Sequence, residues 1–366
     1  MCALNVGIVG CGNISGVYFT NLLRSGVAKV TGCADLDVAK ADAAAERFGI
    51  RAYPSVSALL DDEHIDLVVN LTVPKAHAEV SLAALTAGKH IYSEKPLAST
   101  REDGRAVLAE AAKRGLRVGS APDTFLGGGH QTCRKLLDDG VIGEPVGATA
   151  FMLCHGHESW HPSPEFYYEV GGGPMMDMGP YYLTALVNLL GPIARVTGIA
   201  RTTFAERTIT SEPKRGKVIA VETPTHIAGI MEFAGGPIGT ILTSFDVWHS
   251  TLPRIELYGT EGTLMIPDPN SFGGEPKYML KHETQWRPAP ILHANRENSR
   301  GIGVIDMATA HLADRPHRAS GALAFHVLDV MLGFLDSSNS GGHYVPESTC
   351  DRPAALPAGL QDWELD

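Results

Sequence analysis

The 366-residue sequence has no run of basic residues, and its 30 Lys and Arg are outnumbered by 41 Asp and Glu, which gives a formal net charge of −11. Proteins that bind nucleic acid or anionic lipid usually carry a patch or stripe of positive charge. We therefore expect neither nucleic acid nor a membrane surface as a partner.

Long apolar stretches are also missing. The longest, residues 322–335, is interrupted by His326 and Asp329 and is shorter than the roughly 18–20 residues that span a bilayer. This stretch predicts a core helix. The opening residues MCALNVGIVG lead directly into a predicted strand, without the basic segment and cleavage site of a secretory signal.

Cysteine is scarce, with six residues at positions 2, 11, 33, 133, 154 and 350 and no C-x-x-C pair among them. This pattern predicts reduced thiols and a cytoplasmic protein. Cys11 lies inside a glycine-rich turn. There we expect a small residue that fills the turn, and a redox role is the alternative.

The sequence has enough length for two domains, and its first segment, LNVGIVGCGNISGVYFTNLL, predicts a strand, a tight turn and a helix. Gly10 and Gly12 permit the turn and let backbone N–H groups approach a pyrophosphate at the helix N-terminus. Ser15 stands at the third glycine position of G-x-G-x-x-G. The pattern indicates a dinucleotide site but is imperfect.

A second predicted strand ends in Asp35, which lies 20 residues after Ser15. At that distance an acidic side chain can accept hydrogen bonds from both ribose hydroxyls of an adenosine. Its charge would repel the 2′-phosphate of NADP, and no Arg or Ser stands beside it, so we expect NAD rather than NADP. The alternative is a solvated acid at the start of helix 38–48, where Asp37 is the expected N-cap.

Strands and helices continue to alternate until about residue 122, and strands such as 67–69 are apolar throughout, as in a parallel sheet covered on both faces. This predicts a doubly wound α/β domain, whose ligands lie at the carboxyl ends of the strands. Residues that could shape a turn or bind a ligand follow three of those strands: Thr72, Pro74 and His77 after one, Glu94 and Lys95 after the next, and Asp123 after the last.

From about residue 127 the pattern changes to alternating runs at 193–202, 217–221, 225–233, 238–247, 253–258 and 262–266. These runs predict a mainly antiparallel sheet with one open face. Helices are expected at about 302–313 and 320–336. A sheet of this size packs on helices or pairs with another subunit.

The loop CHGHESWHPSPEFYYEVGGG concentrates three histidines (155, 157, 161) with Trp160, Tyr167 and Tyr168. Aromatic and hydrogen-bonding side chains of this kind suit a sugar ring, so substrate recognition is the leading interpretation. Metal binding by the histidines with Glu158 and a purely structural role are the alternatives.

Three segments, GCGNIS with Asp35, TVPKAHAEVSLAALTAGKHIYSEKPLA and GGGPMMDMGPYY, together resemble the Gfo/Idh/MocA oxidoreductases over residues 4–340. The resemblance implies a Rossmann domain at 1–124, an α+β substrate-binding and oligomerisation domain at 125–345 and a tail at 346–366. It also implies NAD as cofactor, no metal, a carbohydrate or polyol substrate and a homodimer or homotetramer formed through the open sheet.

The resemblance further implies individual roles. Lys95 is expected beside the nicotinamide and the reacting carbon, followed by Pro96 in a possibly cis peptide. Asp177 and Tyr181 lie four residues apart on one helix face, with Tyr181 where the family usually has histidine. The expected cofactor-binding residues are Gly10, Gly12, Asn13, Ile14, Asp35, Thr72, Pro74, His77, Glu94, Lys95 and Asp123. The expected substrate-binding residues are Lys95, His157, Trp160, Asp177 and Tyr181.

The chemical hypothesis is a Lys95–Tyr181 acid/base pair, in which Lys95 lowers the pKa of the tyrosine and Asp177 orients a substrate hydroxyl. Tyr182 is the alternative base, and a structural Tyr181 is another. The predicted activity is hydride transfer between NAD and a secondary alcohol or carbonyl of a sugar, polyol or sugar derivative. Glycoside cleavage with retained NAD and a non-enzymatic NAD-responsive regulator are the alternatives; the presence of Lys95 argues against the regulator.

Overall fold

Six parallel strands form the sheet of the first domain in the computed structural model, which describes residues 3–366. Their order is β3-β2-β1-β4-β5-β6. The strands are β1 (Leu4–Val9), β2 (Ala28–Ala34), β3 (Arg51–Ala52), β4 (Leu67–Asn70), β5 (His90–Ser93) and β6 (Val118–Ser120). All four residues of β4 are buried, as the continuous apolar run predicts for a strand covered on both faces. The predicted doubly wound sheet is confirmed.

Helices connect these strands, and local sequence signals set their ends. They are α1 (Ser15–Leu22), α2 (Val38–Phe48), α3 (Val56–Leu60), α4 (His77–Thr86) and α5 (Arg101–Arg114). The side chain of Thr100 caps α5 by accepting from the Asp103 N–H, and Gly115 ends it in a left-handed conformation. Asp37 occupies the N-cap position of α2, but its side chain makes no capping hydrogen bond.

The second domain contains an eight-stranded sheet in the order β16-β15-β14-β13-β7-β12-β11-β8. Its strands are β7 (Pro145–Leu153), β8 (Ile193–Arg201), β11 (His226–Phe233), β12 (Ile238–Ser244), β13 (Ile255–Gly259), β14 (Gly262–Ile266), β15 (Lys277–Leu280) and β16 (Arg287–Pro288). Only β7 and β12 pair in parallel within it. The predicted mainly antiparallel sheet is confirmed.

One predicted strand does not join this sheet. The run at 217–221 forms β10 (Val218–Ala220), which pairs with β9 (Glu206–Thr208) in a separate two-stranded hairpin. Alternation of apolar residues indicates a strand but carries no information about which partner it finds.

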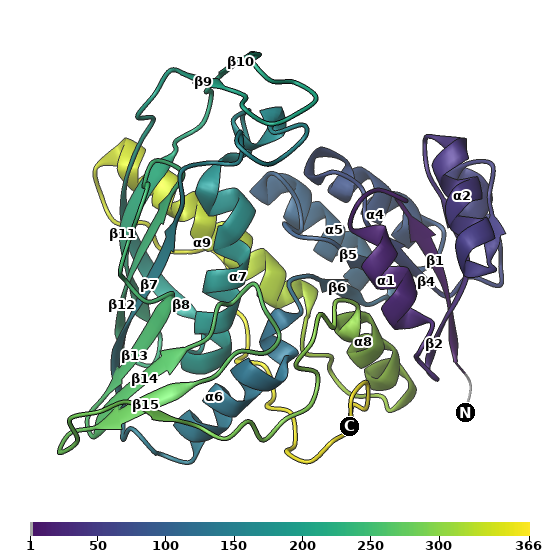
Figure 1. The fold of residues 1–366 in the computed structure, drawn as a ribbon. Helices are drawn as coiled ribbons and strands as arrows, with labels where there is room; N and C mark the ends of the chain where they lie inside the picture. The colour runs from purple at the N-terminus through teal and green to yellow at the C-terminus, as the bar shows by residue number, and fades with distance from the viewer. Residues whose placement is uncertain (1–2) are drawn as a thin grey trace.

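Three helices lie between the large sheet and the first domain (Figure 1): α6 (Gly128–Asp138), α7 (Gly173–Leu190) and α9 (Gly321–Ser340). They cover one face of the sheet and leave the other open. Helix α7 begins at Gly173, before Asp177, and continues through Pro180. Asp177 and Tyr181 therefore lie on one helix, as the motif predicts.

Helix α9 is the one helix among residues 3–366 that is long and apolar enough to cross a membrane by length and composition, but 67% of its apolar window is buried inside the protein. Its polar residues have partners. Asp329 accepts from Arg101 Nε at 2.6 Å, and His326 Nε2 lies 2.9 Å from the Ile193 N–H. The prediction of a core helix is confirmed.

The segment after residue 300 returns to the first domain. Helix α8 (Ile302–Leu312) packs against α1, β2 and β6, although the sequence places it within the second domain at 125–345. The tail 346–366 runs over the surface of both domains and ends near α8 (Figure 1). Its Leu356 N–H donates to Gln131 of α6 at 2.8 Å, and the Trp363 N–H donates to Asn295 at 2.9 Å.

Candidate active site

The turn between β1 and α1 has the geometry of a phosphate-binding loop. Gly10 adopts a φ of +98°, and a Cβ there would lie 2.7 Å from the backbone of Leu71. At Gly12 nothing lies within 4 Å of the Cβ position, so the loop is open there. Ser15 Oγ donates to the Gly12 carbonyl at 2.7 Å and fastens the loop to the start of α1. A serine at the third glycine position therefore supports the loop.

Asp35, at the end of β2, reaches across to this loop. One carboxylate oxygen accepts from the Cys11 N–H at 2.7 Å and the other from the Asp37 N–H at 2.8 Å. No Lys or Arg of residues 3–366 forms an ion pair with it. The loop and the carboxylate fit a dinucleotide whose ribose hydroxyls are free, and Asn13 and Ile14 line the same turn.

Two of the predicted cofactor-binding side chains, His77 and Asp123, are buried and hydrogen-bonded to backbone groups of the protein. His77 is 1% exposed; its Nδ1 lies 2.7 Å from the Pro96 carbonyl and its Nε2 3.0 Å from the Thr72 carbonyl. Asp123 is equally buried, and its Oδ2 accepts from the N–H groups of Gly301 and Gly303 at 2.8 and 3.0 Å. His77 thus connects two turns and Asp123 caps α8, and a part for either residue in cofactor binding stays a prediction.

The turn formed by Glu94, Lys95 and Pro96 is held from several sides. The Tyr18 hydroxyl donates to Glu94 at 2.7 Å, and the Lys95 N–H donates to the other Glu94 oxygen at 2.9 Å. The Lys95–Pro96 peptide is cis, as predicted. Glu94, which follows β5, thus stabilises the turn through a hydrogen bond to each of its two carboxylate oxygens.

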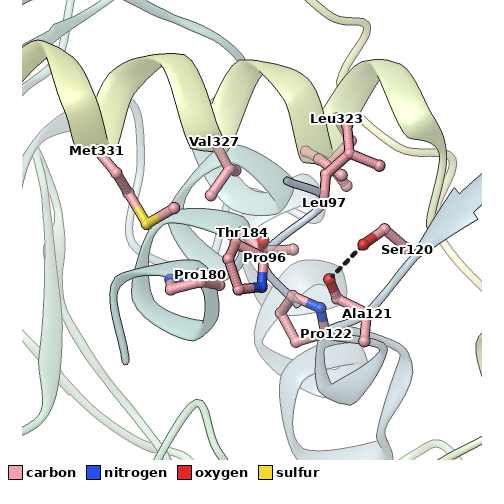
Figure 2. Close-up of a pocket in the computed structure, with 11 residues that line it drawn as sticks. Pro96, Leu97, Ser120, Ala121, Pro122, Pro180, Thr184, Leu323, Val327 and Met331 are labelled. Carbon is pink, nitrogen blue, oxygen red and sulfur yellow. Dashed lines mark hydrogen bonds between the residues drawn. The ribbon is translucent and has the colours of Figure 1, made fainter. Parts of the chain in front are cut away.

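Behind this turn lies a small cavity of about 10 Å³. Figure 2 shows Pro96 and Leu97 of the turn facing Pro122 and the side chains of α7 and α9, among them Pro180, Val327 and Met331. A space of this size holds at most one water molecule. The turn is therefore packed against both helices, and this cavity is too small for a substrate.

The Lys95 ammonium binds α7 directly. It donates to the Asp177 backbone oxygen at 2.7 Å and to Asp177 Oδ1 at 2.9 Å, and both side chains are about 15% exposed. Burial by itself would favour the neutral forms. The attraction between the two groups outweighs burial: the pKa of Asp177 is lowered to about 2 and the pKa of Lys95 is raised. Both groups are charged at neutral pH.

Tyr181 lies beside this pair, with its ring centroid 5.3 Å from Lys95 Nζ. It is 8% exposed. Burial raises the pKa of the phenol, Lys95 and Arg300 lower it, and the net pKa is raised. The expectation that Lys95 lowers this pKa holds for the contribution of Lys95 but not for the net value, because burial is the larger effect.

Arg300 is a site residue that the sequence analysis missed. Its guanidinium donates to the side-chain oxygens of Asn270 at 2.6 Å and Asn298 at 2.9 Å, and it interacts with Tyr181. Arg300 directly precedes Gly301, whose N–H donates to Asp123 at the start of α8. This position in the chain brings the Arg300 guanidinium to Tyr181. No motif marks it, since Tyr181 lies 119 residues away along the chain.

The aromatic loop, residues 154–172, brings His157 to the same aspartate. His157 Nε2 lies 3.1 Å from Asp177 Oδ2, while Trp160 remains 60% exposed at the surface. Tyr182 is buried, and its hydroxyl donates to the Phe151 carbonyl at 3.2 Å. Tyr181, not Tyr182, therefore lies beside Lys95.

The remaining polar residues of the loop do not converge. His155 stacks on Trp248 with ring centroids 3.3 Å apart, and Glu158 accepts from Arg207 at 2.8 Å and from the Tyr168 hydroxyl. Among residues 3–366 no group of three or more His, Cys, Asp or Glu is arranged to hold a metal ion. The loop geometry gives the metal alternative no ligand set.

The five cysteines within the described residues are free thiols, and Cys2 lies outside those residues. The pKa of the Cys11 thiol is raised by its interaction with Cys33 and by burial. A thiol in this state is a poor nucleophile, which agrees with a residue that fills the turn.

Comparison with known proteins identifies both domains. Residues 4–121 match a model described as "Oxidoreductase family, NAD-binding Rossmann fold", and residues 130–265 match the "GFO/IDH/MocA C-terminal domain".

Curated relatives match part of the chain. A dTDP-3,4-didehydro-2,6-dideoxy-alpha-D-glucose 3-reductase of Streptomyces antibioticus is 31% identical over 63% of this chain and 65% of its own. A 1,5-anhydro-D-fructose reductase of Ensifer adhaerens is 30% identical over 47% of this chain and 52% of its own. The chain thus spans less than two thirds of the length of these two relatives.

Solved structures match the whole fold. An NAD binding oxidoreductase from Klebsiella pneumoniae gives a TM-score of 0.82 at 22% identity, covering 94% of this chain and 99% of that one. Levoglucosan dehydrogenase in complex with NADH and L-sorbose gives a TM-score of 0.80 at 20% identity, covering 95% and 100%. At these identities the likeness establishes the fold.

Proposed function

The chain belongs to the GFO/IDH/MocA oxidoreductase family, with its NAD-binding Rossmann fold, and from that premise we propose that it is an NAD-dependent enzyme of carbohydrate metabolism. It would transfer a hydride between nicotinamide and a secondary alcohol or carbonyl of a sugar, polyol or sugar derivative. The observation that carries this proposal is the charged Lys95–Asp177 pair beside Tyr181, at the strand ends next to the glycine loop.

Bound NAD or NADH would supply the hydride acceptor or donor. The loop of Gly10 and Gly12, with Asn13 and Ile14, would hold the pyrophosphate, and Asp35 would accept from the adenosine ribose. Thr72 and Pro74 shape the turn after β4, and Glu94 approaches from the turn after β5. The open loop and the absence of a cation paired with Asp35 favour NAD over NADP.

Lys95 would stabilise negative charge that develops on the substrate oxygen. Its ammonium is held by Asp177 in a mostly buried site, where charge interactions are stronger than in water. Asp177 would also accept a hydrogen bond from a neighbouring substrate hydroxyl. Both roles need the charged forms, which the pair keeps at neutral pH.

Tyr181 would exchange the proton with the substrate oxygen. Since its pKa is raised, it carries its proton at neutral pH. It is therefore suited to donate a proton to a carbonyl there, and it becomes a base only at alkaline pH. This favours reduction of a ketone as the direction that the site supports at neutral pH, and two relatives are named as reductases.

The outer face of the large sheet would form a homodimer or homotetramer. Its exposed apolar side chains include Ile199 at 75%, Ile230 at 55% and Ile238 at 59% exposure, on the three neighbouring strands β8, β11 and β12. An open apolar face of this kind is typical of a subunit interface. We also propose a cytoplasmic location, in keeping with the free thiols.

A spectrophotometric screen tests the activity. Purified protein is given NADH with keto-sugars and NAD⁺ with monosaccharides, inositols and other polyols, with NADP(H) in parallel and absorbance followed at the nicotinamide band. We expect turnover with at least one carbohydrate and a preference for NAD(H). Cleavage of a glycoside without net NADH formation would replace this proposal with the glycoside-cleaving alternative, and failure of every substrate to turn over would contradict it.

A further inference from the structure

His157 and Lys95 divide the Asp177 carboxylate between them. Lys95 Nζ lies 2.9 Å from Oδ1, and His157 Nε2 lies 3.1 Å from Oδ2. The two donors come from different domains, one from the turn after β5 and the other from the aromatic loop. Each carboxylate oxygen thus has its own partner, and rotation of the carboxylate would break both contacts.

The His157 ring is enclosed by aromatic side chains. Ring centroids of Tyr167, Phe245 and Trp160 lie 4.3, 4.6 and 5.1 Å away, and His157 is 7% exposed. Its backbone N–H donates to the Tyr168 hydroxyl at 3.2 Å. The cage and this backbone contact leave the imidazole little freedom to turn.

The two ring nitrogens have different surroundings. Nε2 faces a carboxylate, which only accepts hydrogen bonds, so Nε2 must carry the proton. Nδ1 is buried and has no hydrogen-bond partner among residues 3–366. A second proton on Nδ1 would lie in an aromatic cage without an acceptor, which is costly. The geometry therefore places a proton on Nε2.

We propose that His157 is a positioning residue that donates from Nε2 to Asp177 and thereby keeps the other oxygen of Asp177 on the Lys95 ammonium. This inference rests on the proposed function, and it replaces the prediction that His157 binds the substrate. It gives the aromatic loop a second purpose, because the loop carries the donor to the catalytic pair.

The loop is fastened at the neighbouring residue. Glu158 accepts from Arg207 of the β9–β10 hairpin at 2.8 Å, and its backbone oxygen accepts from Thr210 and Ser211 at 2.9 and 3.1 Å. His157 is therefore fixed by the hairpin as well as by its cage. The position of the Asp177 carboxylate therefore depends on segments as far from His157 along the chain as Phe245, which is 88 residues away.

Two substitutions separate the possible roles of His157. His157→Gln keeps a donor near the Nε2 position but loses the aromatic ring, and His157→Phe keeps the ring but loses the donor. We expect His157→Phe to lower kcat about 10- to 100-fold with an unchanged KM for NADH, because a hydrogen bond to a charged group is lost. We expect His157→Gln to keep kcat within about 5-fold of wild type. His155→Phe, on the same loop without a contact to Asp177, is the matched control.

Wild-type activity of both His157→Gln and His157→Phe would overturn the proposal. An equally large loss of activity in both variants would also overturn it, because it would indicate proton transfer by His157 itself. The proposal also has a test that needs neither turnover nor folded variants of His157. In protein labelled with ¹⁵N-histidine, we expect one buried imidazole to carry its proton on Nε2 near neutral pH and to change its Nε2 signal in Asp177→Ala. A His157 ring with a bare Nε2 would refute the proposal. Failure of the wild-type protein to turn over any carbohydrate would count against the proposed function alone.

Discussion

The Lys95 ammonium donates to two oxygens of Asp177, the backbone carbonyl at 2.7 Å and Oδ1 at 2.9 Å, and so joins the first domain to helix α7 of the second. Neither domain contains the site alone. The turn after β5 supplies the cation, and α7 supplies the carboxylate and the phenol. Any change in how the domains pack will therefore alter the catalytic pair.

Replacing Lys95 by Met removes the cation and leaves His157 as the one side-chain donor to Asp177 among residues 3–366. We expect kcat to fall by about 10²- to 10⁴-fold, because the developing charge on the substrate oxygen loses its stabilising partner. Steady-state kinetics with the best substrate of the screen measures this. Near wild-type turnover of Lys95→Met would remove Lys95 from the mechanism.

Tyr181 sets the pH dependence in the proposed mechanism. In the oxidative direction it must lose its proton before it can accept one, so a raised pKa predicts rates that increase into the alkaline range. In the reductive direction the protonated form acts, so the rate should be flat near neutral pH and fall at high pH. Tyr181→Phe should lower kcat about 10²- to 10³-fold and abolish both trends.

Tyr182→Phe is the matched control, because that hydroxyl donates only to the Phe151 carbonyl. It should leave the pH profile unchanged at a cost of about 1 kcal/mol in stability. An unaltered profile in Tyr181→Phe would assign the proton to another group.

Asp35 decides the choice of cofactor in this proposal. Asp35→Ala should raise the KM for NAD about 10-fold and lower the preference for NAD over NADP by a similar factor, because both the hydroxyl acceptor and the repelling charge are removed. Fluorescence titration with NADH and NADPH measures the two affinities. Asp37→Ala, which alters an exposed neighbour, should change neither, and an NADPH preference in the wild type would contradict the assignment.

Asp123 should make stability depend on pH. Burial raises its pKa to about 6 in the folded protein, above the usual value of 3.8. Between about pH 4 and 6 the folded state therefore binds more protons than the unfolded state, and the free energy of unfolding falls as the pH rises, by up to about 3 kcal/mol from this group. Asp123→Asn cannot titrate and keeps an acceptor for the N–H groups at the start of α8.

Urea unfolding of both proteins at pH 4 and 7 measures this effect. Relative to wild type, Asp123→Asn should be more stable at pH 7 than at pH 4. A difference between the two proteins that does not change with pH would show that the carboxyl does not titrate in this window.

The open sheet face predicts the oligomeric state. Ile199→Lys combined with Ile230→Lys places two like charges on adjacent strands of that face, and burying them in an interface is unfavourable. Light scattering should show a dimer or tetramer for wild type and a smaller species for the double variant. Val218→Lys, on the separate hairpin, should not change the mass.

Much of the fold follows from local patterns in the sequence. The glycine turn, the apolar strands of the parallel sheet and the alternation of the second domain depend on neighbours within about 20 residues, so they can be recognised before the chain is folded. The partner of β10 and the placement of α8 on the first domain could not be predicted, because pairing and packing depend on distant segments.

The sequence by itself determined the family, and it predicted the glycine loop with Asp35 as the NAD site and Lys95, Asp177 and Tyr181 as the reacting set, because each belongs to a short ordered motif. Only the tertiary structure decided how these residues are tuned. It placed Arg300 beside Tyr181, His157 on Asp177, and His77 and Asp123 in supporting positions. It also made burial outweigh Lys95 in setting the pKa of Tyr181. Contacts and desolvation of this kind are created when segments far apart in the chain close around one site, and no local pattern encodes them.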